Sequence, residues 1–247
     1  MFVPLVVLLT GFFMIACEAT RPGRSWPKVA GWWARAVALN GFEALTIVIS
    51  GLAWDRWMVR HRPWSADGLG VTGGAFAGYL TLTFVYYWWH RARHFSEFLW
   101  RWVHRMHHSP QRIEAIASFY KHPIEIFSNG LLSSAVLYWV VGVEVKAAAY
   151  AMLLSGLAEL FYHWNVRTPY WLRYIFQRPE SHCIHHRRGL HSYNYADVPL
   201  WDMLFGTFRN PREWRAQCGF DPEKERKFLE MLAGIDVSIP KSAEGKA

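Results

Sequence analysis

The sequence predicts an all-α integral membrane protein: a bundle of four to five membrane helices under a helical cap that carries a histidine-rich dinuclear metal site. Three observations support this fold class. Apolar residues make up 52% of the 247 residues and charged residues only 19%, below the roughly 25% typical of soluble domains. Several runs with few charges approach the ~20 residues that a helix needs to cross a bilayer. Twelve histidines are present, most of them in short motifs.

Aromatic content and net charge also fit a membrane protein. Fifteen Trp, sixteen Phe and eleven Tyr residues suit the bilayer interface, where one end of the ring is wet. The net charge of +8 is explained most simply by basic residues retained on the cytoplasmic side, and we expect no nucleic-acid partner. Cys17, Cys183 and Cys218 form no Cys-x-x-Cys pair, so no disulfide framework is expected.

Five runs are the candidate membrane crossings. They are residues 2–17, 36–54, 71–89, 126–143 and 147–164. The second run is interrupted by Asn40 and Glu43, and the fifth by Glu159; we expect Glu43 to be a structural hydrogen-bond partner. The end of the first run resembles a lipoprotein cleavage site, but no basic region precedes it, so we expect a retained helix.

Two polar segments, residues 91–123 and 165–247, are expected to form one largely helical cap. They share a side of the membrane only if an even number of crossings separates them, and the fourth and fifth runs supply two. Both segments are rich in Arg and Lys, which places the cap in the cytoplasm. Residues 221–232 predict a short charged helix, and residues 238–247 predict a frayed tail.

Two features outside these segments carry weaker signals. Gly68, Gly70 and Gly73 have the spacing of a dinucleotide-binding fingerprint, but no strand is predicted before them and a membrane run follows. We therefore interpret this segment as a flexible loop. His61 lies between two arginines and is expected to be an interfacial residue.

Eight histidines occur in three boxes with helical spacing. One box is His-x-x-x-His and two are His-x-x-His-His: His90 and His94, then His104, His107 and His108, then His182, His185 and His186. Residues three or four apart share one face of a helix, as two ligands of one metal require. A single such pair more often contains ordinary surface or core histidines. Three boxes on the same predicted side, with His163 at the end of the fifth run, favour a metal site.

The number of histidines predicts two metal ions. A tetrahedral zinc site takes four protein ligands, and these nine histidines exceed the capacity of one ion. His94 and His104 are ten residues apart, about 15 Å along an unbroken helix, so the chain must bend or the boxes must lie on different helices. Imidazole suits iron, zinc and copper alike, so the ligands do not identify the metal.

The order of the boxes resembles that of the fatty acid hydroxylase superfamily, which includes sterol desaturases, sterol methyl oxidases and sphingolipid hydroxylases. The resemblance covers roughly residues 71–209. Further similar segments are residues 121–125 after the second box, residues 161–165 around the isolated histidine, residues 194–195 and residues 201–207.

This resemblance implies a membrane di-iron enzyme of lipid metabolism, which hydroxylates or desaturates a sterol-like or fatty-acyl substrate with O2 and external electrons. The nine histidines would hold two iron ions, which zinc can replace during purification. Residues 71–209 would form the catalytic domain. Residues 1–70 would form the N-terminal membrane helices and their connectors, and residues 210–247 a polar C-terminal helix and tail. No nucleophilic side chain is expected beyond the metal centre.

The resemblance also implies a partner that supplies two electrons per turnover. The sequence shows no haem or iron–sulfur motif, so we expect a separate ferredoxin, rubredoxin or cytochrome with its reductase. Arg187, Arg188, Arg209 and Arg212 form a candidate docking patch for an acidic carrier, although lipid headgroups would suit them equally well. The expected location is the bacterial inner membrane or the endoplasmic reticulum.

Four further residues are expected to support the metal ligands: Glu159, His122, Asn194 and Asp202. Glu159 stands one turn before the isolated histidine, where some relatives carry a second ligand, and would either assist at the metal or pair with a cap arginine. His122 and His191 are weaker ligand candidates and fit supporting or surface roles better.

Two other classes of function remain open from the sequence. One is a zinc-dependent membrane hydrolase, which would remain active without O2. The other is a non-catalytic metal-binding membrane protein, such as a storage or transport protein. Transport would require ligands along a path through the bilayer, whereas these histidines gather at one face.

Overall fold

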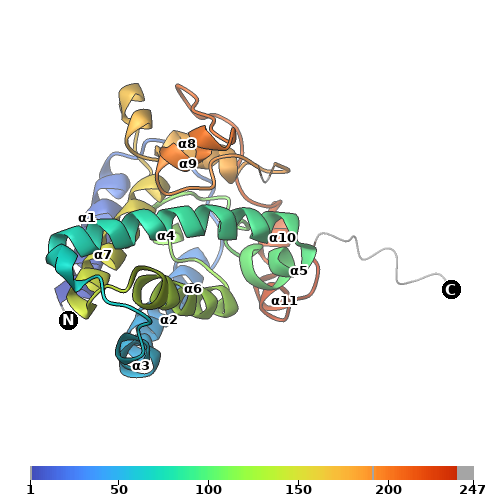
Figure 1. The fold of residues 1–247 in the computed structure, drawn as a ribbon. Coiled ribbons are helices and arrows are strands. Elements are labelled where there is room, and N and C mark those ends of the chain that lie inside the picture. Colours follow the sequence, from blue (N-terminus) through green and yellow to red (C-terminus); the bar gives the residue numbers. More distant parts are fainter. Residues whose placement is uncertain (1, 191, 238–247) are drawn as a thin grey trace.

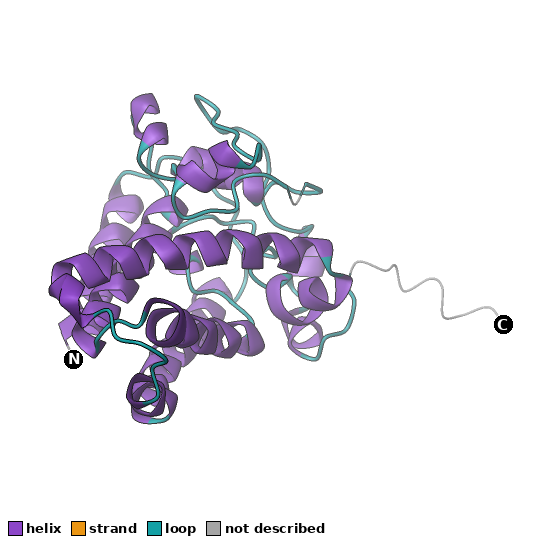
Figure 2. Cartoon of the chain, in the orientation of Figure 1, coloured by secondary structure: helices purple, strands orange, loops and turns teal. Residues whose placement is uncertain are grey.

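The computed structural model describes residues 2–190 and 192–237. Every regular element among these residues is a helix, which confirms the predicted fold class (Figure 2). The β-type pairing in the described chain is an isolated antiparallel bridge between Arg187 and Cys218. The expectations for His191 and for the tail at residues 238–247 fall outside the described residues.

Long helices form the membrane part of the fold. They are α1 (Phe2–Thr20), α2 (Trp32–Leu52) with α3 (Trp54–Arg60), α4 (Gly70–Phe95), α6 (Pro123–Ala135) with the π-helical segment η4 (Val136–Val141), and α7 (Val145–His163). Four spans among the described residues are long and apolar enough to cross a bilayer, and Leu5–Thr20 in α1 is a shorter apolar helix. Large apolar side chains such as Phe12, Val48 and Phe76 are exposed on the helix surfaces, as expected for lipid contact.

The longest helix carries the first histidine box out of the bilayer. α4 has 26 residues, about 39 Å, whereas the hydrocarbon core is ~30 Å thick. Its start corrects the interpretation of the glycine segment as a flexible loop: Asp67–Leu69 forms a 3-10 turn (η1), and α4 begins at Gly70. Gly70 has a φ of +64°, a left-handed conformation that glycine adopts without strain, so the chain turns directly into the helix.

Small residues let the central helices pack closely. α4 packs against α7, α1 also packs against α7, and α2 packs against α6. A Cβ atom added at Gly78 would lie 2.8 Å from Leu137 and 3.3 Å from Ala151. Such close approach of backbones at small residues is a common basis of helix association in membranes. In the view of Figure 1, α4 lies between the cap helices α8 and α9 and the helices α2 and α3.

The cap consists of short helices joined by long irregular segments, so its regular elements are helical, as the fold class predicts, but less of its chain is helical than expected. Its elements are α5 (Glu97–Leu99), η2 (Trp100–His104), η3 (Ala115–Ala117), η5 (Tyr170–Tyr174), α8 (Pro179–His185), α9 (Pro199–Leu204), α10 (Pro222–Glu225) and α11 (Phe228–Leu232). The single helix expected at residues 221–232 is divided in two, because Lys227 leaves the helical region with a ψ of 49°. The break lets Phe228 and Met231 pack on the core formed by the start of α2 and the cap.

Candidate metal centre

Nine histidines converge into two groups at the cap end of the bundle. The first group contains His90, His94, His104, His108 and His185, and the second contains His107, His163, His182 and His186. Within each group, one ligand atom from every residue lies within 4.8 Å of the others. His90 and His94 are partly exposed, and the other seven are buried. Each His-x-x-His-His box contributes to both groups, so the two groups are interlocked.

A break after α4 brings the first two boxes together. Ser96 has an extended backbone, with φ −96° and ψ 117°, and its Oγ accepts a hydrogen bond from the Leu99 amide at 3.3 Å. The chain then restarts as α5 and the π-helical segment η2, which ends at His104. The separation of His94 and His104 predicts either a bend or boxes on different helices, and the structure shows both, because the chain turns at Ser96 and the second box begins at the end of η2. Single π-helical turns occur frequently at functional sites.

Five histidines use Nδ1 to bind an oxygen acceptor. The pairs are His90 with the Tyr195 carbonyl (2.7 Å), His104 with Glu125 Oε1 (2.9 Å), His107 with the Tyr120 carbonyl (3.3 Å), His163 with the Glu159 carbonyl (2.9 Å) and His185 with the Tyr193 carbonyl (2.8 Å). Carbonyl and ionised carboxylate oxygens only accept, so Nδ1 carries the proton in these pairs. In a neutral ring, Nε2 then presents a lone pair to the interior of the group.

These lone pairs face one another at short range. The Nε2 atoms of His90 and His104, two rings whose Nδ1 is bonded to an oxygen, are 2.9 Å apart. In the second group, the Nε2 lone pair of His163 faces Nε2 of His182 at 3.1 Å. Two lone pairs at this separation repel unless a proton or a cation lies between them. Burial, reinforced by neighbouring positive groups, lowers the pKa of His104 and of His182 well below the usual range, which disfavours the proton. Both groups therefore fit metal ions, since ligating imidazoles must be neutral.

Glu125 is a functional residue that the sequence analysis did not single out. Its fully buried carboxylate accepts from His104 Nδ1 and also pairs with Arg93. Arg93 lies inside the first histidine box and Glu125 follows the second, two positions after Pro123. A signal was thus present in the sequence, because a carboxylate beside a histidine box commonly orients a ligating ring.

Asp202 holds the loop that supports two histidines. Its carboxylate accepts from the Tyr195 and Ala196 amides, both at 2.9 Å, and from Thr207 Oγ1 at 2.7 Å. The carbonyls of Tyr193 and Tyr195 in this loop bind His185 and His90. Burial raises the pKa of Asp202 to about 6, although the bonds from Thr207 and the two amides oppose the shift.

Asn194 fixes the same loop from the other side. Its amide donates to the carbonyls of Ser181 (2.7 Å) and Arg209 (2.8 Å), and its Oδ1 accepts from the Arg209 amide at 2.8 Å. Tyr193 and Asn194 have φ values of 69° and 52°, which are uncommon for residues other than glycine. Asn194 and Asp202 therefore lie where they position the histidines without contacting either group directly.

Three other polar residues lie outside both histidine groups, and the contacts of two of them, Glu159 and Glu43, differ from the expectation. Glu159 pairs with Lys121 at 2.5 Å rather than with an arginine, and it meets His163 only through its backbone carbonyl. His122 belongs to neither histidine group: its Nδ1 accepts from the Ile124 amide at 3.1 Å at the start of α6, and its Nε2 lies 3.1 Å from the Leu232 carbonyl. Glu43, expected to be a structural partner, makes no hydrogen bond with any described residue and instead lines a cavity.

The remaining expectations concern cysteines, an interfacial histidine and a basic patch. Cys17, Cys183 and Cys218 are free. His61 is exposed and stacks on Trp57. In the proposed docking patch, Arg187, Arg209 and Arg212 are exposed. Arg188 instead binds within the cap, to the Phe220 carbonyl and Asp221. The other two lie against aromatic rings: Arg209 over Tyr193 and Arg212 over Tyr170.

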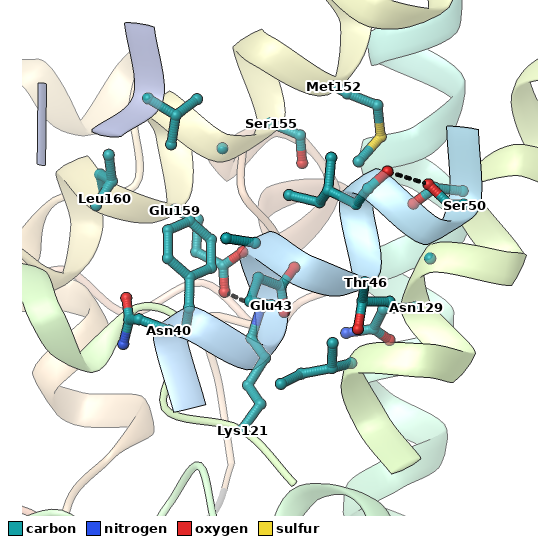
Figure 3. Close-up of a pocket in the computed structure, with 18 of the residues that line it drawn as sticks. Asn40, Glu43, Thr46, Ser50, Lys121, Asn129, Met152, Ser155, Glu159 and Leu160 are labelled. Atoms are coloured by element: carbon teal, nitrogen blue, oxygen red, sulfur yellow. Dashed lines mark hydrogen bonds and ion pairs between the residues drawn. The ribbon is translucent and has the colours of Figure 1, made fainter. Parts of the chain in front are cut away.

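A cavity of about 860 Å³ connects the histidine groups with the membrane helices. Histidines from both groups line one end, and Ser50, Val145 and Lys146 line the other. Apolar side chains from α1, α2, α7 and other elements line it together with many polar residues, of which Asn40, Lys121 and Glu159 are among those that project into it (Figure 3). Its volume lies within the range of small-molecule sites, so a lipid chain can lie between the membrane helices and reach the histidines.

Comparison with known proteins agrees with this geometry. The model of the fatty acid hydroxylase family matches residues 75–207. Similar proteins include alkylglycerol monooxygenase of Homo sapiens, 26% identical over 70% of this chain and 38% of that protein, and ornithine lipid hydroxylase OlsE of Rhizobium tropici, 32% identical over 63% and 48%. Sphinganine C4-monooxygenase 1 of Arabidopsis thaliana is 24% identical over 58% and 56%.

The matched region thus spans about half or less of the length of most of these relatives. No solved structure matches the chain. The relatives named here are lipid monooxygenases or hydroxylases, and the family match covers more than half of the chain and includes every histidine box. The chain belongs to the fatty acid hydroxylase family.

Proposed function

We propose that this protein is a membrane-bound di-iron oxygenase that hydroxylates or desaturates a lipid with O2 and electrons from a separate donor. The observation that carries the proposal is the convergence of nine histidines into two groups at the end of an apolar cavity. The names of the relatives support oxidation of a lipid.

The histidines would hold the metals through Nε2 wherever Nδ1 is already bonded to an oxygen. Tyr193, Tyr195 and Glu125 then fix the rings of His185, His90 and His104, and Asp202 fixes the loop. When bound, two iron ions supply the capacity to activate O2 and oxidise a C–H bond, which side chains alone lack. Replacing a residue that hydrogen-bonds to a metal-ligating histidine typically lowers metal affinity or activity 10–100-fold.

The cavity would orient the lipid and exclude water. Its apolar wall would hold an alkyl chain against the helices, and the part lined by histidines would receive one carbon of that chain. Holding the reacting atoms in place supplies a large part of a catalytic effect. We assign the catalytic unit to residues 71–209, with α1 and α2 from residues 1–70 completing the cavity wall.

The cap would face the cytoplasm of a bacterium, or the cytoplasmic side of the endoplasmic reticulum. Basic residues in the cap segments support this orientation. A soluble ferredoxin, rubredoxin or cytochrome with its reductase would reach the cap from that side. Of the basic patch, the exposed Arg187, Arg209 and Arg212 are placed to meet an acidic carrier.

Product analysis under labelled oxygen tests the function. The purified protein, reconstituted with iron, is incubated with a membrane lipid extract, a ferredoxin–reductase pair, NADPH and ¹⁸O2. We expect a lipid that gains one ¹⁸O atom, or loses two hydrogens, only when protein, O2 and reductant are all present. A product that forms equally without O2 would refute the oxygenase and favour a hydrolase.

A further inference from the structure

The cavity beside the histidine groups carries more negative than positive side chains. Five carboxylates and three cationic groups line it: Glu43, Asp55, Glu125, Glu159 and Asp197 against Arg93, Lys121 and Lys146. The wall between them is largely apolar, and an ionised group in such surroundings is costly unless a partner of opposite charge is close. The electrostatics of the cavity therefore favour a positively charged ligand.

Four of the five carboxylates already have partners within the protein. Glu125 pairs with Arg93, and Glu159 pairs with Lys121 at 2.5 Å. Asp55 accepts from Ser134 Oγ at 2.5 Å, and Asp197 accepts from Tyr162 Oη at 3.0 Å.

Glu43 differs from these four. It makes neither a hydrogen bond nor an ion pair with any described residue, and it projects from α2 into the cavity, toward Lys121 and Glu159 (Figure 3). The single charge of Lys121 cannot neutralise both glutamates, and its short contact is to Glu159. The cluster of Glu43, Lys121 and Glu159 thus has one carboxylate in excess.

This cluster lies close to the second histidine group. Glu159 precedes His163 by four residues on α7, a rise of about 6 Å. Lys121 follows Tyr120, whose carbonyl faces Nδ1 of His107. A ligand group held by the cluster would therefore lie about one helical turn from the histidines.

We propose that Glu43, beside the Glu159–Lys121 pair, binds the protonated amine of a long-chain lipid; this deepens the proposed function and rests on it. An ammonium group brings the missing positive charge and three N–H donors. A hydroxyl group would offer one donor and leave the charge uncompensated. The amine belongs to a lipid headgroup or to a free long-chain base, which share this chemistry.

The position of the cluster also predicts where the lipid is oxidised. α1 packs on α7, and Phe12 of α1 and Leu160 of α7 both line the cavity. α2 packs on α6 instead, and Ile47 of α2 lines the cavity from a different wall. An alkyl chain fits between these walls. With the amine at Glu43, the carbon that reaches the histidines lies near the polar end of the lipid rather than at its terminal methyl group.

Binding of simple amphiphiles tests the subsite without turnover. The full chain in nanodiscs of zwitterionic lipid is titrated with octadecylamine and with octadecanol, and empty nanodiscs correct for partitioning. We expect the wild-type protein to bind the amine at least about tenfold more tightly than the alcohol, as a charged hydrogen bond allows. Equal affinity for the two would overturn the proposal.

Variants locate the preference. Glu43→Gln removes the charge with little change of shape and should abolish the preference for the amine, whereas Glu43→Asp should keep part of it. Glu144→Gln is the matched control, because Glu144 does not line the cavity and its replacement removes the same charge. Retention of the full preference in Glu43→Gln, with an unchanged unfolding temperature, would contradict the assignment.

Competition identifies the source of the amine. Lysophosphatidylethanolamine and sphinganine are each tested against bound octadecylamine; displacement by either amine supports the subsite and shows whether a headgroup or a free base fits. Displacement by octadecanol at equal concentration would count against it. These outcomes do not depend on O2 or iron, so amine binding without any O2-dependent product, neither ¹⁸O-labelled nor desaturated, would refute the oxygenase and leave the subsite standing.

Discussion

The carboxylate of Glu125 accepts a hydrogen bond from Nδ1 of His104 across 2.9 Å, although the two residues are 21 positions apart in the chain. Both are fully buried, and Arg93 shares the same carboxylate oxygen. This contact fixes the ring of His104, whose Nε2 lies 2.9 Å from that of His90 and 3.1 Å from that of His108. One carboxylate therefore orients the ring at the centre of the first histidine group.

Replacing Glu125 should weaken metal binding more than it weakens the fold. In Glu125→Gln the neutral amide oxygen can still accept, but it no longer offers His104 and Arg93 a negative charge, so we expect the affinity of the first group to fall about 10–100-fold. Titration of metal-stripped protein with Fe(II) or Co(II) measures this. Glu144→Gln, outside the site, serves as the control, and a wild-type isotherm for Glu125→Gln would argue against an orienting role.

Asp202 should impose a pH dependence on stability that its amide variant lacks. Burial raises its pKa from 3.8 to about 6, so the folded state takes up the proton more readily than the unfolded state. This group's contribution to the free energy of unfolding is then full below about pH 4 and is lost as the pH rises through 6, by at most roughly 3 kcal/mol.

The unfolding temperature of metal-stripped protein, followed by tryptophan fluorescence, provides the measurement. The advantage of the wild-type protein over Asp202→Asn should shrink between pH 4 and pH 7. A difference that stays constant over this range would mean that the carboxyl titrates as in a solvated aspartate.

A bulky residue at Gly41 should obstruct the cavity and leave the fold intact. Gly41 lines the cavity from α2, and a Cβ atom there would meet no heavy atom within 4 Å. Gly41→Leu should therefore fold normally but reduce lipid oxidation by roughly tenfold or more, because a displaced chain no longer presents the right carbon. Gly68→Leu is the control, since Gly68 is equally open but lies outside the cavity. Unchanged turnover in Gly41→Leu would show that substrate takes another route.

The cytoplasmic orientation of the cap is testable by labelling of single cysteines. In a cysteine-free background, Glu97→Cys and Arg215→Cys place thiols at exposed cap positions, and Ser65→Cys places one at an exposed position between α3 and α4. A membrane-impermeant maleimide applied to intact cells should label position 65 and spare positions 97 and 215. The reverse pattern would invert the topology, and different results at the two cap positions would contradict a single cap.

Much of this architecture can be predicted from local sequence patterns. Hydropathy locates the long helices, and the spacing of the boxes identifies the histidines, because both depend on helical periodicity. The need for a bend between His94 and His104 follows from the same geometry, and the structure provides it at Ser96.

Other features depend on contacts that local patterns do not encode. The division of each His-x-x-His-His box between two groups depends on how α8 and η2 face each other. Glu125, Glu159 and His122 contact residues that are 21, 38 and 110 positions away in the chain. The helix and strand preferences of neighbouring residues cannot predict such distant contacts. In the irregular parts of the cap, side chains such as those of Asp202 and Asn194 form hydrogen bonds with backbone groups that would otherwise pair within a helix.

The number of metal ions per chain is the most direct test of the central claim. The protein is purified without added metal, reconstituted anaerobically with Fe(II), freed of excess iron, and analysed for metal and for protein concentration by amino-acid analysis. The two histidine groups predict two ions per chain, and loss of one of the two in His163→Ala, which alters only the second group. A stoichiometry of one ion or none in the wild-type protein would contradict the dinuclear centre.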